Sequence, residues 1–186
     1  MKKETRKAIF LDRDGVINVD TGYVFRWADF EFAPGVVPAL KKLTGAGYPL
    51  VIITNQSGVA RGYYTEQDVK TLTAQMTSYL AAQGVLITAT YYCPHHVEGT
   101  VALYTRACDC RKPGPALLRQ AANEHDLSLA DSMMIGDKGS DIEAARAAGV
   151  GKAYLIDAKA ATPPSPSPQP DGVFKDLSAC VDYLLR

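Results

Sequence analysis

The sequence lacks a net charge and a long apolar run. Its 20 Lys and Arg residues balance 20 Asp and Glu residues in a chain of 186, so the formal net charge is zero. A nucleic-acid-binding domain usually carries an excess of basic residues, and this composition argues against one. No apolar segment approaches the ~20 residues that a membrane-spanning helix needs. We therefore expect no nucleic-acid partner and no membrane partner.

The sequence also lacks an export signal. Met1 to Lys7 is basic but runs directly into an apolar strand, without the apolar region and cleavage site of a signal peptide. We therefore expect a cytoplasmic protein. The hydrophobic content of 47% is enough for a single domain over residues 1–186 with a full core. The short, evenly charged chain is compatible with a monomer.

Cysteine is scarce, but three of the four cysteines are grouped near two histidines: Cys93, Cys108 and Cys110. In a cytoplasmic chain such thiols stay reduced, and the Cys-x-Cys spacing is awkward for a disulfide. Thiolates and an imidazole together suit tetrahedral Zn²⁺. We predict a structural zinc site in a loop over 93–110, with His95 or His96 as the fourth ligand. Arg111-Lys112 follows the last cysteine directly, so the metal is expected to position Lys112.

Buried strands alternate with amphipathic helices along the chain. The predicted strands are 8–12, 50–53, 87–92, 133–135 and 153–156, and the predicted helices are 36–46, 65–82, 115–125, 140–148 and a last helix after Asp176. This alternation indicates an α/β fold with a doubly wound parallel sheet covered on both faces. Cys180 lies on the apolar face of the last helix and is expected in the core. The Pro- and Ser-rich segment from Thr162 to Pro170 is expected to be a surface loop.

Polar side chains follow three of these strands, and parallel strands bring such residues to one edge of the sheet. The residues are Asp12 and Asp14, then Thr54 and Asn55, then Asp137, Lys138 and Asp141. Two carboxylates at i and i+2 repel each other, and a hard cation such as Mg²⁺ would hold them together. With Lys112, they form a set suited to phosphoryl transfer, in which a carboxylate attacks phosphorus and cations neutralise phosphate.

The order of these motifs resembles the haloacid dehalogenase (HAD) superfamily of phosphatases. The pattern is Asp-x-Asp-Gly, an apolar strand with Thr, then Lys, then Gly-Asp-x-x-x-Asp. Phe-Leu-Asp-Arg-Asp-Gly-Val-Ile-Asn, Thr-Asn-Gln-Ser-Gly-Val-Ala-Arg-Gly, Cys-Pro-His-His, Cys-Asp-Cys-Arg-Lys-Pro and Gly-Asp-Lys are similar to its histidinol-phosphate phosphatase-like subfamily. The likeness runs from about residue 8 to residue 156 and implies a Rossmann-like HAD core.

The resemblance implies a role for each motif residue. Asp12 is expected to be the nucleophile that forms an aspartyl-phosphate, and Asp14 the general acid and base. Asp12, Asp14 and Asp137 are expected to bind catalytic Mg²⁺, while Thr54 and Lys112 bind the transferring phosphoryl group. The resemblance favours His95 as the fourth zinc ligand. Asp141 is expected either to support the metal site from behind or to pair with a cation at a helix start.

Substrate contacts are expected from loops beside these motifs. The predicted residues are Asp20, Thr21, Gly22, Tyr23, Asn55, Gln56, Ser57, Arg61, Arg111 and Lys138, in addition to Thr54 and Lys112. Arg61 and Arg111 would suit a second, non-reacting phosphate by bidentate contact.

The resemblance implies a small-molecule sugar bisphosphate as substrate, specifically a heptose bisphosphate used in the supply of surface polysaccharide. The alternative is histidinol phosphate, and the long interval from His95 to Cys108 favours the heptose. A polynucleotide 3′-phosphatase is disfavoured by the zero net charge, and an inactive zinc-stabilised binding module by the intact acid and lysine motifs. The intervals between Asp14, Thr54 and Lys112 are too short for a cap domain, so we expect a capless enzyme.

Overall fold

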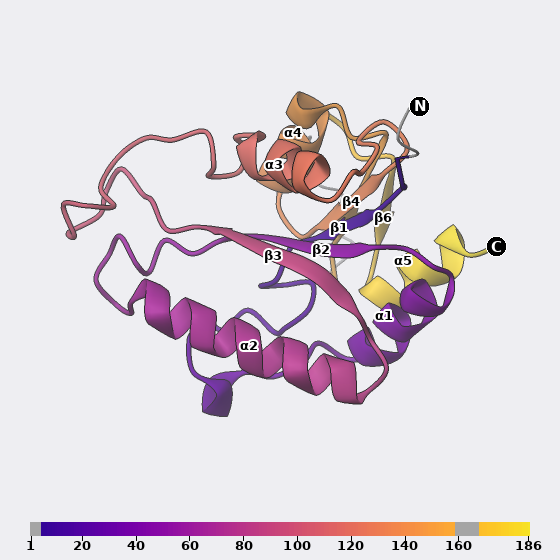
Figure 1. The fold of residues 1–186 in the computed structure, drawn as a ribbon, viewed down its shortest axis with the longest axis horizontal. Coiled ribbons are helices and arrows are strands. Elements are labelled where there is room, and N and C mark those ends of the chain that lie inside the picture. Colours follow the sequence, from indigo (N-terminus) through magenta and orange to yellow (C-terminus); the bar gives the residue numbers. More distant parts are fainter. Residues whose placement is uncertain (1–4, 159–167) are drawn as a thin grey trace.

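The computed structural model describes residues 5–158 and 168–186, and these form a parallel α/β fold (Figure 1). The strands are β1 (Ile9–Leu11), β2 (Leu50–Asn55), β3 (Ile87–Cys93), β4 (Met133–Gly136), β5 (Lys152–Ile156) and β6 (Gly172–Phe174). Within the described residues they form a six-stranded sheet in the order β3-β2-β1-β4-β5-β6, and neighbouring strands are parallel. This is the predicted doubly wound sheet, and its strand order reverses at β1.

Helices cover both faces of this sheet. They are α1 (Val36–Gly45), α2 (Glu66–Ala82), α3 (Ala116–Glu124), α4 (Gly139–Ala148) and α5 (Leu177–Leu184), with a short 3-10 helix η1 (Trp27–Asp29) before α1. Side chains alternate along β1: Ile9 and Leu11 pack with α1, α2 and α5, whereas Ala8 and Phe10 pack with α3 and α4. Figure 1 shows α3 and α4 on one side of the sheet and α1, α2 and α5 on the other. The consecutive apolar residues of β1 are therefore explained by burial on both faces.

The helices begin and end where their terminal residues predict. Thr65 and Asp68 form a reciprocal capping box at the start of α2, and the Asp176 side chain accepts a hydrogen bond from the Ala179 N–H at the start of α5. Gly149 ends α4 in the left-handed conformation. Cys180 lies on the inner face of α5 and is fully buried in the core, as expected.

Two elements were not predicted, namely η1 and the edge strand β6. Each has three residues, which is too short for an apolar periodicity to emerge, and β6 is defined by its pairing with β5. Most of the predicted surface loop from Thr162 to Pro170 lies outside the described residues.

No cap domain interrupts the described segment from residue 14 to residue 112. Between β1 and β2 the chain forms η1 and α1, and between β2 and α3 it forms α2, β3 and the loop that carries His95, Cys108 and Cys110. Figure 1 shows this loop extending beyond the sheet where β3 ends, near the beginning of α2. Among the described helices, none has the length and apolar character needed to cross a bilayer.

Candidate active site

A pocket of about 490 Å³ lies where the carboxyl ends of β1 and β2 meet the start of α4. The predicted residues that line it are Asp12, Asp14, Asp20, Gly22, Tyr23, Asn55, Gln56, Ser57, Arg111, Lys112 and Lys138. Tyr64, Pro113 and Ser140, which sequence reasoning did not select, complete the lining. The topology therefore brings together four chain segments that are far apart in the sequence, at the switch point of the sheet.

Lys112 is the buried cation of this site. Its Nζ lies 2.9 Å from Asp12 Oδ1 and 2.6 Å from Asp141 Oδ1, and it donates to the Ile53 carbonyl at 2.8 Å. The ammonium group therefore has one carbonyl acceptor and two carboxylate oxygens at ion-pair distance. Burial disfavours the charge, but the two carboxylates outweigh it and raise the pKa of Lys112. Lys112 is therefore held as a cation directly beside Asp12.

Asp12 is supported by the backbone as well as by Lys112. The Arg13 N–H donates to Asp12 Oδ1 at 2.7 Å, and the Asp12 N–H donates to the Ile135 carbonyl of β4 at 3.0 Å. These bonds fix the residue between the two central strands of the site. Burial raises the pKa of the Asp12 carboxyl, and the neighbouring Lys112 ammonium opposes that rise.

An acidic cluster beside Lys112 has the donor set of a hard cation. Asp12, Asp137 and Asp141 each offer an oxygen within 4.8 Å of the others. Asp137 Oδ1 is buried and has no hydrogen-bond partner among the described residues. Burial, and then the charge of Asp12, raises the pKa of Asp137 to about 7. Crowded carboxylates with an orphaned buried oxygen fit Mg²⁺, which takes oxygen ligands.

Asp141 connects the acidic cluster to the start of α4. Its Oδ1 faces Lys112, and its Oδ2 accepts a hydrogen bond from the Lys138 N–H at 3.0 Å. It therefore pairs with a cation, as one of the two expectations stated. It also belongs to the group that could hold a metal, whereas the other expectation gave it a supporting role behind the ligands.

Asp14 is held by a set of donors that includes a residue sequence reasoning missed. Arg13 Nη2 lies 2.8 and 3.0 Å from the two Asp14 oxygens, and Asn18 Nδ2 donates to Oδ1 at 3.0 Å. The Arg13 side chain is almost fully buried, and Nη2 also donates to the Val24 carbonyl. An arginine between two acids in a short motif was the signal available in the sequence, because a buried guanidinium requires such partners.

Gln56 lines the pocket, although it is almost fully buried, and it connects three polar groups. Its Nε2 donates to Asp14 Oδ2 and to Thr54 Oγ1, each at 2.9 Å, and its Oε1 accepts from the Tyr64 hydroxyl at 2.7 Å. Burial raises the pKa of Tyr64 to about 12, so the phenol remains a donor at neutral pH. Thr54 is itself buried and is not among the residues that line the pocket.

Asn55 lines the pocket, but its amide faces the backbone of Lys112. Its Nδ2 donates to the Lys112 carbonyl at 3.1 Å, and its Oδ1 accepts from the Lys112 N–H at 3.0 Å. The amide therefore joins the end of β2 to the segment that carries the lysine.

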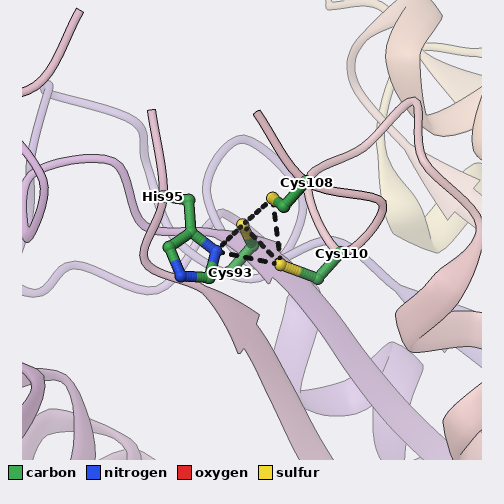
Figure 2. A group of neighbouring side chains, drawn as sticks. All are labelled: Cys93, His95, Cys108 and Cys110. Carbon is green, nitrogen blue, oxygen red and sulfur yellow. Dashed lines mark hydrogen bonds between the residues drawn. The ribbon is translucent and has the colours of Figure 1, made fainter. Parts of the chain in front are cut away.

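Cys93 at the end of β3 and three side chains of the loop that follows it, His95, Cys108 and Cys110, converge on one point (Figure 2). The Sγ atom of Cys110 lies 3.0 Å from that of Cys93, 3.1 Å from that of Cys108 and 3.2 Å from His95 Nδ1. All the thiols are free, and the four ligand atoms lie within 4.8 Å of one another. Burial raises the pKa of the Cys93 thiol, so a cation is needed to stabilise its thiolate. The cluster has the composition of a closed tetrahedral metal site.

The adjacent histidine points elsewhere. His96 contacts Arg61, and Arg61 also pairs with Glu98 at 3.2 Å. The two candidates for the fourth ligand are thereby distinguished by geometry, and His95 is the one that faces the sulfurs.

Besides Thr54, two predicted substrate contacts lie outside the pocket lining. Arg61 is not among the residues that line the pocket, and Thr21 lines a neighbouring hollow of about 420 Å³ instead. Lys138 lies at the pocket and contacts Asp20 at 3.3 Å. Arg111 both lines the pocket and lies 3.5 Å from the His95 carbonyl.

Comparison with known proteins identifies the family of this chain. Residues 109–180 match the HAD-hydrolase-like family model. The chain is 45% identical over 171 residues to D-glycero-beta-D-manno-heptose-1,7-bisphosphate 7-phosphatase from Escherichia coli strain K12, which covers 92% of this chain and 90% of the relative. It is 48% identical over 149 residues to the protein of the same name from Yersinia pestis, covering 80% and 79%.

A solved structure is similar over the whole fold. The D,D-heptose 1,7-bisphosphate phosphatase from B. bronchiseptica, complexed with magnesium and phosphate, superposes with a TM-score of 0.80 at 32% identity, covering 96% of this chain and 98% of that chain. The family match, the relatives and this superposition all point to the same family of phosphatases. The chain is therefore a phosphoric monoester hydrolase of the HAD superfamily, and it belongs to the family of the D-glycero-beta-D-manno-heptose-1,7-bisphosphate 7-phosphatases.

Proposed function

We propose that this enzyme removes the 7-phosphate of D-glycero-D-manno-heptose 1,7-bisphosphate, as the names of its relatives state for them. The product, a heptose 1-phosphate, would supply ADP- or GDP-heptose for lipopolysaccharide or another surface polysaccharide. The observation that carries the proposal is the contact of a buried ammonium, Lys112, with a buried carboxylate, Asp12. This pair suits attack by a carboxylate on a phosphate dianion, because the ammonium offsets their mutual repulsion.

In the proposed mechanism Asp12 attacks phosphorus and forms an aspartyl-phosphate while the bond from phosphorus to the sugar O7 breaks. Asp14 gives a proton to the leaving oxygen, then takes one from the water that hydrolyses the intermediate. Arg13, Asn18 and Gln56 hold the Asp14 carboxyl in place for both transfers. Lys112 binds the transferring phosphoryl group. Thr54 would contact the same group from a buried position, in which its hydroxyl accepts a hydrogen bond from Gln56.

Mg²⁺ is the proposed catalytic cofactor, held by Asp12 and Asp137 with Asp14 as a further ligand. When bound, it would neutralise charge on the transferring phosphoryl group and on the acidic cluster. The orphaned Asp137 oxygen supports this assignment. Zn²⁺ is the proposed ion of the cluster formed by Cys93, His95, Cys108 and Cys110, where four protein ligands leave no position open for chemistry. We infer that its role is structural.

The proposed substrate fits the charge distribution of the pocket. Arg111 would bind the 1-phosphate that does not react, because a guanidinium can contact a phosphate at two points. Asp20, Gly22, Tyr23 and Ser57 would meet the hydroxyl groups of the sugar, and Lys138 would bind the substrate after release from Asp20. Arg61 is left out of this proposal because it pairs with Glu98 away from the pocket.

A phosphate-release assay tests the proposed substrate. Both anomers of the heptose bisphosphate and histidinol phosphate should be compared with Mg²⁺ present, and ³¹P NMR should identify the phosphate that remains. We expect the higher kcat/KM with a heptose bisphosphate and retention of the anomeric phosphate. A tenfold preference for histidinol phosphate would assign the enzyme to histidine biosynthesis instead.

A further inference from the structure

Asn55 occupies an unusual position for a pocket residue, because both ends of its amide are used within the protein. The residue ends β2, where it pairs with Cys93 of β3. Its side chain crosses to the Lys112 backbone, accepting from the N–H at 3.0 Å and donating to the carbonyl at 3.1 Å. The two residues are 57 positions apart in the sequence.

We propose that Asn55 is a positioning residue whose amide fixes the backbone of Lys112, rather than a residue that contacts the substrate. The inference rests on the proposed role of Lys112 in binding the transferring phosphoryl group. The proposal differs from the expectation that Asn55 contacts the sugar or phosphate, because here the amide acts on the same reaction by positioning Lys112.

The backbone at Lys112 needs such a partner. The residue lies in neither a helix nor a strand, so its N–H and carbonyl have no partner within a regular element. A primary amide presents one acceptor and one donor close together, and it can satisfy both groups at once. An aspartate at the same place would accept from the N–H but would set a carboxylate oxygen against the Lys112 carbonyl.

The two hydrogen bonds between the Asn55 amide and the Lys112 backbone also help to position the lysine side chain. Lys112 Nζ is fixed by three acceptors at the far end of the side chain, and the amide fixes the near end. With both ends defined, few rotamers of the lysine remain accessible, and less conformational entropy is lost when phosphate binds. Asn55 itself belongs to β2, which pairs with a neighbouring strand on each side.

The metal cluster provides a second tether that is less direct. Cys110 is two residues before Lys112, so the cluster fixes the chain near the lysine but leaves the backbone torsions of residues 111 and 112 to other contacts. The Gln56 N–H donates to the Cys93 carbonyl at 2.8 Å, so both tethers start from the ends of β2 and β3. The Asn55 amide acts on Lys112 itself, so removing the amide should lower kcat even when the cluster keeps its metal.

A double-mutant cycle tests the proposal. The parent, Asn55→Ala, Lys112→Ala and the double variant should be compared by kcat and KM with heptose 1,7-bisphosphate, using single-turnover measurements for the slow variants. We expect Asn55→Ala to lower kcat about 10- to 100-fold in the parent. In the Lys112→Ala background it should cost less than about threefold, because the residue it positions is gone.

Ser57→Ala is the matched control, because Ser57 lines the same pocket and follows the same strand end. Its cost should be the same in both backgrounds. If Asn55→Ala instead cost as much without Lys112 as with it, the amide would act on the substrate directly and the proposal would be overturned. If Lys112→Ala kept parental activity, the proposed role of Lys112 would fail first, and this result is distinct from additivity.

Hydrogen exchange gives a readout that does not depend on activity. In ¹⁵N-labelled holoenzyme, the Lys112 amide should exchange at least tenfold faster in Asn55→Ala, while the zinc content stays at the parental level. Asn55→Asp, which keeps the acceptor, should protect that amide but not restore kcat. An unchanged Lys112 exchange rate in Asn55→Ala would overturn the proposal.

Discussion

Lys112 Nζ lies closer to Asp141 than to Asp12, at 2.6 Å and 2.9 Å from the respective Oδ1 atoms. Asp141 is fully buried, and its second oxygen accepts from the Lys138 N–H. Asp141, in the first turn of α4, and Asp12, the proposed nucleophile, therefore both contact the ammonium group. A residue that the motif alone left ambiguous is thereby shown to belong to the acidic cluster and to contact its neighbouring cation.

Asp141→Asn should lower kcat about 10- to 100-fold without unfolding the protein. The amide keeps an oxygen but removes one of the two charges that hold the ammonium, and its NH₂ group would face Lys112 in one orientation. Steady-state kinetics and circular dichroism measure the two effects. Glu143→Gln, on the same helix, removes a charge away from Lys112 and should keep kcat within twofold. Equal losses in both variants would refute a specific role for Asp141.

Asp12→Asn should abolish turnover with the fold intact, because an amide is not an effective nucleophile and is a weaker ligand for Mg²⁺. Asp14→Asn should lower the rate by ~10²–10⁴-fold, since proton transfer typically contributes that much. Phosphate release measured for both variants checks these values. Activity of Asp12→Asn within tenfold of the parent would remove this residue as the nucleophile.

The enzyme should be purified with about one zinc ion per chain, and it should require added Mg²⁺ for activity. Cys110→Ser and Cys108→Ser should both lose zinc and lower the rate, by up to about a hundredfold, because the chain that leads to Lys112 is loosened. Circular dichroism should be largely retained, since the sheet does not include this loop. Elemental analysis without zinc in reduced protein, or full activity of a zinc-free variant, would contradict the assignment.

Gly15→Ala should weaken Mg²⁺ binding. A Cβ on Gly15 would lie 2.2 Å from Asp137 Oδ2, and the residue has a φ of +87°. We expect the Mg²⁺ concentration for half-maximal activity to rise at least tenfold. Gly47→Ala is the matched control, because Gly47 has a φ of +81° but no atom within 4 Å of its added Cβ. It isolates the backbone strain from the contact with Asp137, and a similar Mg²⁺ shift in both variants would exclude that contact as the cause.

Asp171, near the edge of the sheet, should make the free energy of unfolding depend on pH. It pairs with Arg146 at 2.7 Å and Lys152 at 3.0 Å, and it accepts from the Ala153 N–H at 2.8 Å. Burial works to raise its pKa, but these bonds prevail and lower the pKa to about 2. Because the folded pKa lies below the unfolded value, the stabilisation is present above about pH 4 and is lost as the pH falls toward about 2.

Asp171→Asn should therefore lower the free energy of unfolding by about 1.5 kcal/mol at neutral pH, less than the pKa shift alone implies because solvent screens an exposed carboxylate, and by progressively less as the pH falls below about 4. Urea unfolding at several pH values measures the difference. Asp182→Asn breaks an exposed pair with Lys42 and should change stability by less than about 1 kcal/mol. A difference between parent and Asp171→Asn that did not depend on pH would contradict this account.

Much of the fold was predictable because buried strands and helix ends have recognisable sequence patterns. The apolar runs that became β1, β2, β4 and β5 are buried on both faces, and the caps at Thr65 and Asp176 mark helix starts through local hydrogen bonds. In contrast, β6 is defined by its pairing with β5, so the sequence of Gly172–Phe174 alone could not predict it.

The site was predictable to the extent that its chemistry is confined to residue types and spacing. The carboxylates, the lysine and the four metal-site side chains were identified because few other residues can supply their donors, and the fold brings them together. The roles of Gln56 and Asn55 were not predictable. A primary amide can bind a sugar, a phosphate or a peptide group, and its sequence position does not distinguish these partners.

The sequence by itself determined the class of fold, the order of the elements and the set of groups available for chemistry, because these follow from local periodicity, capping and donor type. Only the tertiary structure decided which groups meet. Asp12, which directly follows β1, lies beside Lys112, Asp141 contacts the ammonium group from α4, and the Asn55 amide at the end of β2 binds a backbone 57 residues away. Such contacts depend on strand order and register, and these are properties of the packed chain as a whole.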